Sequence, residues 1–411
     1  MSSWPLCAAL LLAIGISAAP SGMAQNRKVT DAEVDRIAKS AILIDTHNDV
    51  TSKTVAGFDI GKGADDGGHT DLTRLRAGGV GAVFFAVFVG ANYTNGNHSA
   101  NRALEMIDTV RHDIVDGHPN DFLFATTASD IERAHKEGKI AALMGIEGGH
   151  AIEDSPRLLR DFYALGIRYM TLTHSNTNNW ADSSGDTEKA GVTHHDGLTP
   201  LGKEIVLEMN RLGMIVDISH VSDKTFWDAL ETSKAPLFAS HSSARAIANI
   251  PRNMTDEMIA ALGKKGGVVQ INFGCDFLSQ KSADAAAKSG GMQKFMAVME
   301  QYKDNPAKQR EEMTKLRAEM ARTAVRATVA DVVAHIDHVK QLAGIDAVGI
   351  GTDFDGVGCV PEGLDDVSKF PNLTRALLEK GYSESEIRKI YGGNTLRLMR
   401  EVEKAAAKPS L

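Results

Sequence analysis

The stretch that begins Met214-Ile-Val-Asp-Ile-Ser-His220 and ends Pro236-Leu-Phe-Ala-Ser-His241 contains two short apolar runs, each closed by a histidine. The two histidines are 21 residues apart, which fits one strand–helix unit. Continuous apolar runs, rather than alternating ones, are typical of parallel strands buried on both faces. The stretch therefore predicts two neighbouring parallel strands with an imidazole at each carboxyl end.

The same pattern recurs through the chain, with helical periodicity in the segments between the runs. The eight runs cover residues 41–45, 80–88, 140–147, 167–174, 214–220, 236–241, 267–273 and 347–353. Eight strand–helix units predict an α/β fold of the (β/α)8 TIM-barrel type. A doubly wound open sheet is the alternative, because periodicity alone does not show that a sheet closes.

The segments outside the eight runs indicate how the chain is organised. Residues 1–24 hold no charged side chain and run from an apolar stretch into small residues, which predicts a signal peptide; a retained anchor is the alternative. We expect a single catalytic domain over residues 25–411, periplasmic or secreted, with no transmembrane helix in the mature form. Residues 284–327 predict a helical insertion of two helices between strands seven and eight: a solvated decoration, a lid or a dimer contact.

The charge balance excludes one class of partner. The 411 residues include 45 basic and 53 acidic side chains, a net charge of −8. No basic tract is long enough to follow a phosphate backbone, so we expect no nucleic-acid partner.

Polar side chains stand at the carboxyl ends of the apolar runs, and these ends meet at one mouth in a barrel. His47 and Asp49 are two residues apart and share a face in extended chain. Glu147 lies between glycines and has two oxygens that can bridge two ions. With His220 and His241 they supply three imidazoles and two carboxylates, a set that suits two zinc ions. Each residue taken alone is more often structural.

Four further residues are candidates for the chemistry. Asp353 could take a proton from a metal-bound water and deliver it to a leaving amine, whereas Asp355 could fix the turn. His174 could be a fourth imidazole ligand or a donor to a developing oxyanion. Arg252 could hold a carboxylate at two points, with a solvated surface arginine as the alternative.

Seven motifs, in order across roughly residues 32–405, resemble the renal (membrane) dipeptidase family. They are Ile44-Asp-Thr-His-Asn-Asp49, Gly145-Ile-Glu-Gly-Gly149, Thr171-Leu-Thr-His174, Asp217-Ile-Ser-His220, Ser240-His-Ser-Ser-Ala-Arg245, Asn249-Ile-Pro-Arg-Asn253 and Gly351-Thr-Asp-Phe-Asp-Gly356. The resemblance implies a (β/α)8 barrel with a binuclear zinc site that hydrolyses dipeptides, some with a D residue in second place. It also leaves a homodimer open, since family members often form dimers.

The resemblance also implies a role for each matching residue. His47, Asp49 and Glu147 would hold one zinc ion, and Glu147, His220 and His241 the other, so that Glu147 and a hydroxide or water bridge the pair. His174 and Arg252 match substrate-binding positions, and Asp353 matches the acidic residue at the catalytic centre. Phe277 stands where better-known members carry a tyrosine, so one contact to the substrate would be lost.

Two rival functions remain open, as does one covalent link. The first rival is a related binuclear amidohydrolase that acts on N-acyl amino acids or lactones, and the second is a secreted binding protein without catalysis. Cys275 and Cys359 follow neighbouring strands of the expected barrel and could form a disulfide or remain as two thiols.

Overall fold

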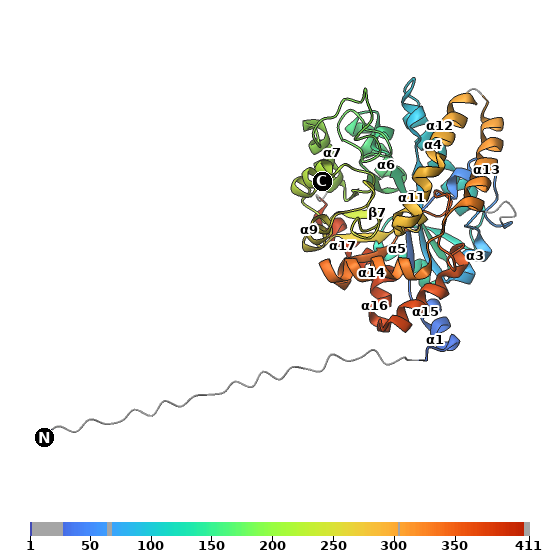
Figure 1. Cartoon of the computed structure of the whole chain (residues 1–411), viewed down its shortest axis with the longest axis vertical. Coiled ribbons are helices and arrows are strands. Elements are labelled where there is room, and N and C mark those ends of the chain that lie inside the picture. Colours follow the sequence, from blue (N-terminus) through green and yellow to red (C-terminus); the bar gives the residue numbers. More distant parts are fainter. Residues whose placement is uncertain (2–27, 64–67, 303–304, 407–411) are drawn as a thin grey trace.

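The computed structural model describes residue 1 and residues 28–63, 68–302 and 305–406 (Figure 1). Apart from Met1, the expected signal peptide over residues 1–24 lies outside the described residues. Within the described ranges, no helix combines the length and the apolar character that crossing a membrane requires.

Eight parallel strands form a nearly closed barrel in the order β1-β2-β4-β5-β6-β7-β8-β9, which confirms the predicted fold. The strands are β1 Leu43–Asn48, β2 Val80–Phe88, β4 Ile140–Glu147, β5 Ile167–Thr171, β6 Ile215–Asp217, β7 Phe238–Ser242, β8 Val268–Ile271 and β9 Val348–Ile350. A ninth strand, β3 (Phe122–Phe124), pairs with β4 off this path. The sequence did not predict it, because three apolar residues are too few to stand out.

Helices surround the barrel (Figure 1). They are α1 Asp31–Ser40, α2 Thr51–Thr54, α3 Leu72–Gly78, α4 Ser99–Asp108, α5 Ala128–Lys136, α6 Pro156–Leu165, α7 Pro200–Leu212, α8 Asp223–Thr232, α9 Asp256–Lys264, α10 Cys275–Leu278, α11 Gln280–Ser289, α12 Gly291–Gln301, α13 Pro306–Thr323, α14 Val329–Ala343, α15 Phe370–Lys380, α16 Glu384–Arg388 and α17 Asn394–Ala405. Several begin at a capping side chain; Thr127, for example, accepts from the backbone of Asp130 at the start of α5.

The barrel closes between β9 and β1 through side-chain and loop contacts. The Thr46 hydroxyl lies 3.0 Å from the carbonyl oxygen of Ile350. Beyond the strand ends, Asp353 N donates to His47 O at 3.0 Å and Asp49 N donates to Phe354 O at 2.8 Å. Closure therefore places the segment after β9 directly against the carboxyl end of β1, where His47 and Asp49 lie.

The mouth of the barrel lies at the carboxyl ends of the strands. Helix α1 leads into the amino end of β1 and lies at the bottom of Figure 1, whereas α12 and α13 follow β8 and lie at the upper right. The stretch 284–327, where two helices were expected, holds the end of α11 and all of α12 and α13. Lys294 Nζ and Glu319 Oε1, 2.9 Å apart, join α12 to α13.

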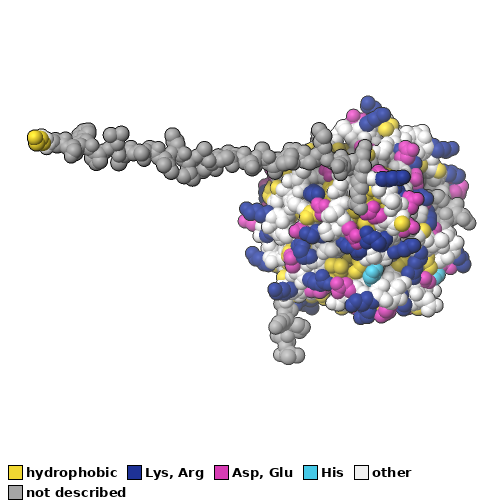
Figure 2. All heavy atoms as spheres, turned by 90° about the horizontal axis from the view of Figure 1, so that it is seen from below, with side chains coloured by type: hydrophobic (Ala, Val, Ile, Leu, Met, Phe, Trp, Pro, Cys, Tyr) yellow, Lys and Arg dark blue, Asp and Glu magenta, His cyan; other side chains and the backbone are white. Residues whose placement is uncertain are grey.

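The surface carries charges of both signs. On the face shown in Figure 2, basic and acidic side chains are interspersed, and hydrophobic side chains form only small separate areas. This distribution offers no continuous basic track on that face.

Gly145, in the middle of β4, makes room for a large side chain inside the barrel. A Cβ atom at this position would lie 2.0 Å from the ring of Tyr169 on β5. Tyr169 is fully buried, so its ring has no free space to move into. The glycine therefore fixes where the Tyr169 hydroxyl lies.

We predict that Gly145→Ala lowers the free energy of unfolding by about 1–3 kcal/mol, because the added methyl group overpacks the barrel. Gly358→Ala is the matched control, since its Cβ would meet only the Met320 Cε atom, at 3.8 Å. Its expected change is within about 0.5 kcal/mol. Urea denaturation followed by circular dichroism measures both, and equal midpoints for the two variants would contradict the overpacking argument.

Candidate metal centre

The fold brings five predicted ligand residues to one end of the barrel. His47 is the fifth residue of β1, not a residue after the strand as expected, and Asp49 follows β1 directly. Glu147 is the last residue of β4, and His241 lies within β7. His220 lies three residues beyond β6, in the left-handed region at a φ of 65°. These residues come from the carboxyl ends of four strands, β1, β4, β6 and β7, which meet at one mouth.

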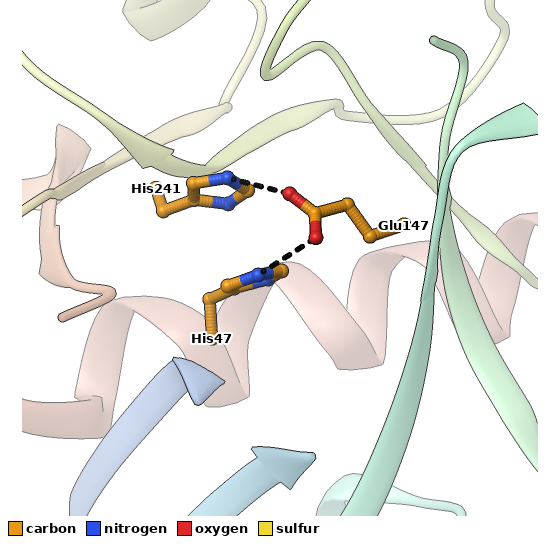
Figure 3. A group of neighbouring side chains, drawn as sticks. All are labelled: His47, Glu147 and His241. Atoms are coloured by element: carbon orange, nitrogen blue, oxygen red, sulfur yellow. Dashed lines mark ion pairs between the residues drawn. The ribbon is translucent and has the colours of Figure 1, made fainter. Parts of the chain in front are cut away.

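Glu147 contacts three imidazoles, and Figure 3 shows its two oxygens directed at His241 and His47. Its Oε1 atom is 2.9 Å from His220 Nε2 and 3.2 Å from His241 Nε2. Its Oε2 atom is 3.5 Å from His47 Nε2. The two carboxylate oxygens therefore face different imidazoles, which is the arrangement that a bridging carboxylate needs.

Asp49 and Asp353 complete the side of the group next to β1. Asp49 Oδ2 is 3.3 Å from His47 Nε2. His47, Asp49 and Asp353 each offer a ligand atom, and these atoms lie within 4.8 Å of one another. The same is true of His47, Glu147 and His241. His47 Nε2 and Asp49 Oδ2 are buried, and within the described part of the chain neither makes a hydrogen bond beyond the ion pair between them. Buried polar atoms without partners are costly unless something binds them.

Ionisation of the group shows which charge it requires. Burial opposes a charge on His47, yet Tyr169 first, and then the carboxylates of Glu147 and Asp49, raise the pKa of His47 well above its ordinary value. Burial also opposes a charge on Glu147, but the surrounding imidazoles, that of His47 first, hold its pKa well below the usual range. The buried carboxylates therefore favour positive charge at this point, and a divalent cation can supply it in place of the His47 proton.

Hydrogen bonds behind the group fix the orientation of His47. The Tyr169 hydroxyl donates to the carbonyl oxygen of Thr46 at 3.2 Å and lies 2.7 Å from His47 Nδ1. Because the hydroxyl proton is used on Thr46, the hydroxyl accepts the proton on Nδ1. His47 Nε2 then points its lone pair into the group once its own proton has left.

A hydrogen bond from behind fixes the orientation of the His241 ring in the same way. Ser240 Oγ donates to Asp217 Oδ2 at 2.6 Å and lies 2.7 Å from His241 Nδ1, so it accepts the proton from that nitrogen. Burial lowers the pKa of His241 and of His220 well below the ordinary value, so both rings are neutral. Their Nε2 atoms are 3.0 Å apart. Neutral imidazoles held from behind by a hydroxyl or carboxylate are typical metal ligands.

The donor set fits a divalent metal. It consists of nitrogen and carboxylate oxygen atoms without thiolate, it is buried, and it contains unpartnered atoms that face one another. Nitrogen–oxygen sets of this kind suit zinc and similar ions in catalytic sites. Gly356 lets the segment after β9 approach closely, since a Cβ there would lie 2.5 Å from Asp49 Oδ2.

His174 lies on the rim, three residues beyond β5. Its Nε2 atom is 3.8 Å from Glu147 Oε1, and its ring meets the edge of Phe88 at 4.9 Å between centroids. Burial lowers the pKa of His174, so the ring is neutral and can donate one hydrogen bond. It is one-fifth exposed, which leaves it open to the mouth.

Arg252 extends from the segment before α9 toward the metal centre. Its Nη1 donates to Ser242 Oγ at 2.6 Å and its Nη2 donates to His241 O at 2.8 Å. Burial lowers the pKa of Arg252 to about 10, so the guanidinium stays charged at neutral pH. Within the described residues, Arg252 Nε is buried without a partner. An anionic group beside the metal centre would satisfy it.

Asp353 and Asp355 take different roles, although they are two residues apart. Asp353 accepts a hydrogen bond from Asn272 Nδ2 at 2.8 Å, and burial followed by the Asp49 charge raises its pKa well above the usual range. Asp355 accepts from the backbone of His69 at 3.0 Å and lies 3.2 Å from Lys53 Nζ. Asp355 therefore fixes loop segments, as the sequence suggested, while Asp353 faces the metal centre.

Sequence reasoning missed the residues that support the centre from behind. Tyr169, Ser240 and Asn272 lie in or next to strands, where they resemble ordinary interior residues. Asp217 carried the one signal that was available, since it is a carboxylate inside an apolar run. It accepts bonds from Thr171, Ser219 and Ser240, and so joins three strands.

Comparison with known proteins identifies the family and the fold of the chain. A family model described as membrane dipeptidase (peptidase family M19) matches residues 31–411. The probable dipeptidase PvdM from Pseudomonas aeruginosa is 26% identical with a TM-score of 0.76, over 92% of this chain and 99% of its own. A metallopeptidase from Rhodobacter sphaeroides, solved with a phosphinate mimic of the dipeptide L-Ala-D-Ala, is 26% identical with a TM-score of 0.71, over 88% of this chain and 100% of its own.

We predict that Tyr169→Phe weakens the binding of Zn²⁺ by about 10- to 100-fold, because His47 loses the acceptor that orients its ring. Tyr391→Phe is the matched control: Tyr391 is also buried, and its hydroxyl bonds Thr374 at 2.6 Å, apart from the metal centre. Competition with a chromogenic chelator measures both affinities. An unchanged affinity in Tyr169→Phe would show that the hydroxyl does not support the ligand.

Proposed function

The chain belongs to the membrane dipeptidase family, peptidase family M19, and we propose that it hydrolyses dipeptides that carry a free C-terminal carboxylate, with two zinc ions. The observation that carries the proposal is the position of Arg252: a buried, charged guanidinium with an unpartnered Nε donates to His241 O, beside a cluster of carboxylates and imidazoles. We therefore propose that hydrolysis takes place at this cluster, and that the substrate carboxylate binds to Arg252 beside it, at the same mouth of the barrel.

Five residues would hold the ions. His47, Asp49 and Glu147 would bind one, and Glu147, His220 and His241 the other, with Glu147 shared. Ions in this cluster would supply Lewis acidity, which polarises a carbonyl group and acidifies water.

The residues of the chain provide the other parts of the reaction. Hydrolysis breaks the C–N bond: the carbonyl carbon gains the hydroxyl group of water and the amine nitrogen gains its proton. The Asp353 carboxylate accepts that proton and releases it to the leaving nitrogen. The neutral His174 donates a hydrogen bond to the carbonyl oxygen as negative charge develops there. Arg252 holds the C-terminal carboxylate and so places the scissile bond.

The range of substrates includes L-Xaa-L-Xaa and, we propose, L-Xaa-D-Xaa dipeptides. The Rhodobacter sphaeroides metallopeptidase is liganded with a mimic of L-Ala-D-Ala, which supports a D residue in second place. A related amidohydrolase acting on N-acyl amino acids or lactones is the second candidate. N-acyl amino acids also carry a carboxylate for Arg252, and they are the nearer rival for that reason.

We further propose that the mature protein is periplasmic or secreted and forms a homodimer. The uncharged apolar stretch in residues 1–24 supports export, and the disulfide between Cys275 and Cys359 suits an oxidising compartment. Fractionation of the source cells and light scattering of the purified protein test the two statements separately.

The test of the proposed function is amine release from a panel of dipeptides with L or D second residues, each also supplied as the C-terminal amide. We expect cleavage of the free acids only, loss of activity with a chelator and recovery with Zn²⁺. N-acetyl amino acids and lactones belong in the same panel. Turnover of these, with none of the dipeptides, would replace the proposal with the amidohydrolase alternative, and metal binding without turnover would favour a binding protein.

We predict that Arg252→Ala raises the KM for free-acid dipeptides about 10- to 100-fold, because charge-assisted hydrogen bonds to the carboxylate are lost. Arg160→Ala is the control, since Arg160 pairs with Glu208 at the surface of α6. Steady-state kinetics of both variants decide the point. If Arg252→Ala left KM unchanged, the substrate carboxylate would have to bind elsewhere.

A further inference from the structure

A short segment after β8, residues 272–278, contacts both the proton-transfer residue and the carboxylate-binding residue. At its start, Asn272 Oδ1 accepts from Gly274 N at 2.5 Å, and Asn272 Nδ2 donates to Asp353 Oδ2 at 2.8 Å. The amide is thus oriented by the turn that follows it. Asn272 is fully buried next to the strand end, so Asp353 is held at the start of the segment, before the disulfide.

At the other end, Phe277 supports Arg252. The guanidinium carbon of Arg252 lies 5.4 Å from the centre of the Phe277 ring, a cation–π contact. Asn253, the next residue, donates from Nδ2 to the carbonyl oxygen of Phe277 at 2.9 Å. The Phe277 ring therefore packs against the Arg252 guanidinium, while Ser242 Oγ and His241 O accept hydrogen bonds from its two Nη atoms.

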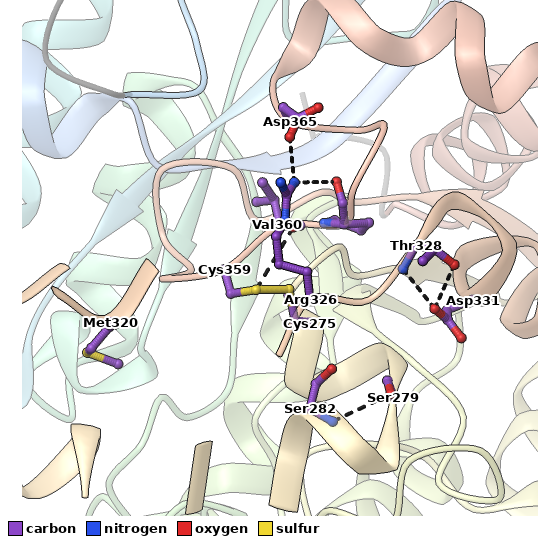
Figure 4. Close-up of a disulfide and its surroundings, with 12 residues drawn as sticks. Cys275, Ser279, Ser282, Met320, Arg326, Thr328, Asp331, Cys359, Val360 and Asp365 are labelled. Atoms are coloured by element: carbon purple, nitrogen blue, oxygen red, sulfur yellow. Dashed lines mark hydrogen bonds and ion pairs between the residues drawn. A yellow bond between two sulfur atoms is a disulfide. The ribbon is translucent and has the colours of Figure 1, made fainter. Parts of the chain in front are cut away.

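The helix that carries Phe277 is too short to hold itself in place. α10 consists of four residues, and a single helical turn is not stable alone. Its first residue, Cys275, forms a disulfide with Cys359 in the segment after β9 (Figure 4). Cys275 N also donates to Cys359 O at 3.0 Å. The covalent bond thus anchors α10 to the same segment that carries Asp353.

We propose that the Cys275–Cys359 disulfide is a positioning bond for substrate recognition: it holds Phe277 against Arg252 so that the guanidinium is directed at the substrate carboxylate. The inference rests on the proposed function. It assigns the disulfide an effect on KM and little effect on kcat, because Arg252 binds a distant group of the substrate while Asn272 holds Asp353 from the strand end.

The test is a double-mutant cycle between the disulfide and the ring. The variants are Cys275→Ser/Cys359→Ser, Phe277→Leu and the triple variant, with Phe277→Tyr as the conservative control that keeps the aromatic face. We expect the disulfide variant and Phe277→Leu each to raise the KM for a free-acid dipeptide about 3- to 30-fold. The kcat and the zinc content should stay within about twofold of the wild type in the disulfide variant and in Phe277→Leu. Phe277→Tyr, which keeps the ring and adds a hydroxyl at the position of the family's substrate contact, should not raise KM.

The cycle separates positioning from general stability. In the Phe277→Leu background, breaking the disulfide should raise KM no further, since both changes act through one contact. Independent, multiplying effects on KM would overturn the inference, as would a parallel loss of kcat and zinc. Phe277→Leu keeps the disulfide, so an unchanged KM in that variant overturns it even if the cysteine variant folds poorly. A wild-type protein that cleaves no dipeptide would overturn the proposed function, and this inference with it.

Discussion

A buried carboxylate surrounded by imidazoles is the constraint on which the rest of this structure depends. Glu147 ends strand β4 of the barrel, and its oxygens face His47, His220 and His241 within 2.9–3.5 Å. A carboxylate removed from water must be compensated by positive charge or by hydrogen bonds. The barrel provides this by directing the ends of several strands at one point, so the carboxylate needs the complete fold around it.

The support for these ligands extends a further layer into the barrel. Gly145 leaves the space that the Tyr169 ring fills, and the Tyr169 hydroxyl fixes the tautomer of His47. On the neighbouring strands β6 and β7, Asp217 orients Ser240, and Ser240 orients His241. The side chains inside the barrel thus form a packed core and also orient the imidazole rings of His47 and His241. This second role explains why polar side chains are present deep inside the barrel.

Much of this arrangement could be predicted from the sequence, because the signals were local. Continuous apolar runs marked the eight barrel strands, and polar residues at their carboxyl ends marked the mouth. β3 was missed because its three residues carry no periodicity, and His47 proved to lie inside its strand. Tyr169, Ser240 and Asn272 could not be recognised, since their roles depend on how each strand is rotated about its own axis, which no short window of sequence records.

The disulfide has a further consequence for how the protein can vary. Its two cysteines are separated by 84 residues, and helices α11, α12, α13 and α14, strand β9 and Asp353 lie between them. The cross-link joins α10, before helices α11 to α13, to the segment after β9. Helix α14 and strand β9 belong to the barrel and are constrained by it. Only α11, α12 and α13 can therefore lengthen, shorten or change composition over evolutionary time while the disulfide keeps α10 in its place at the rim.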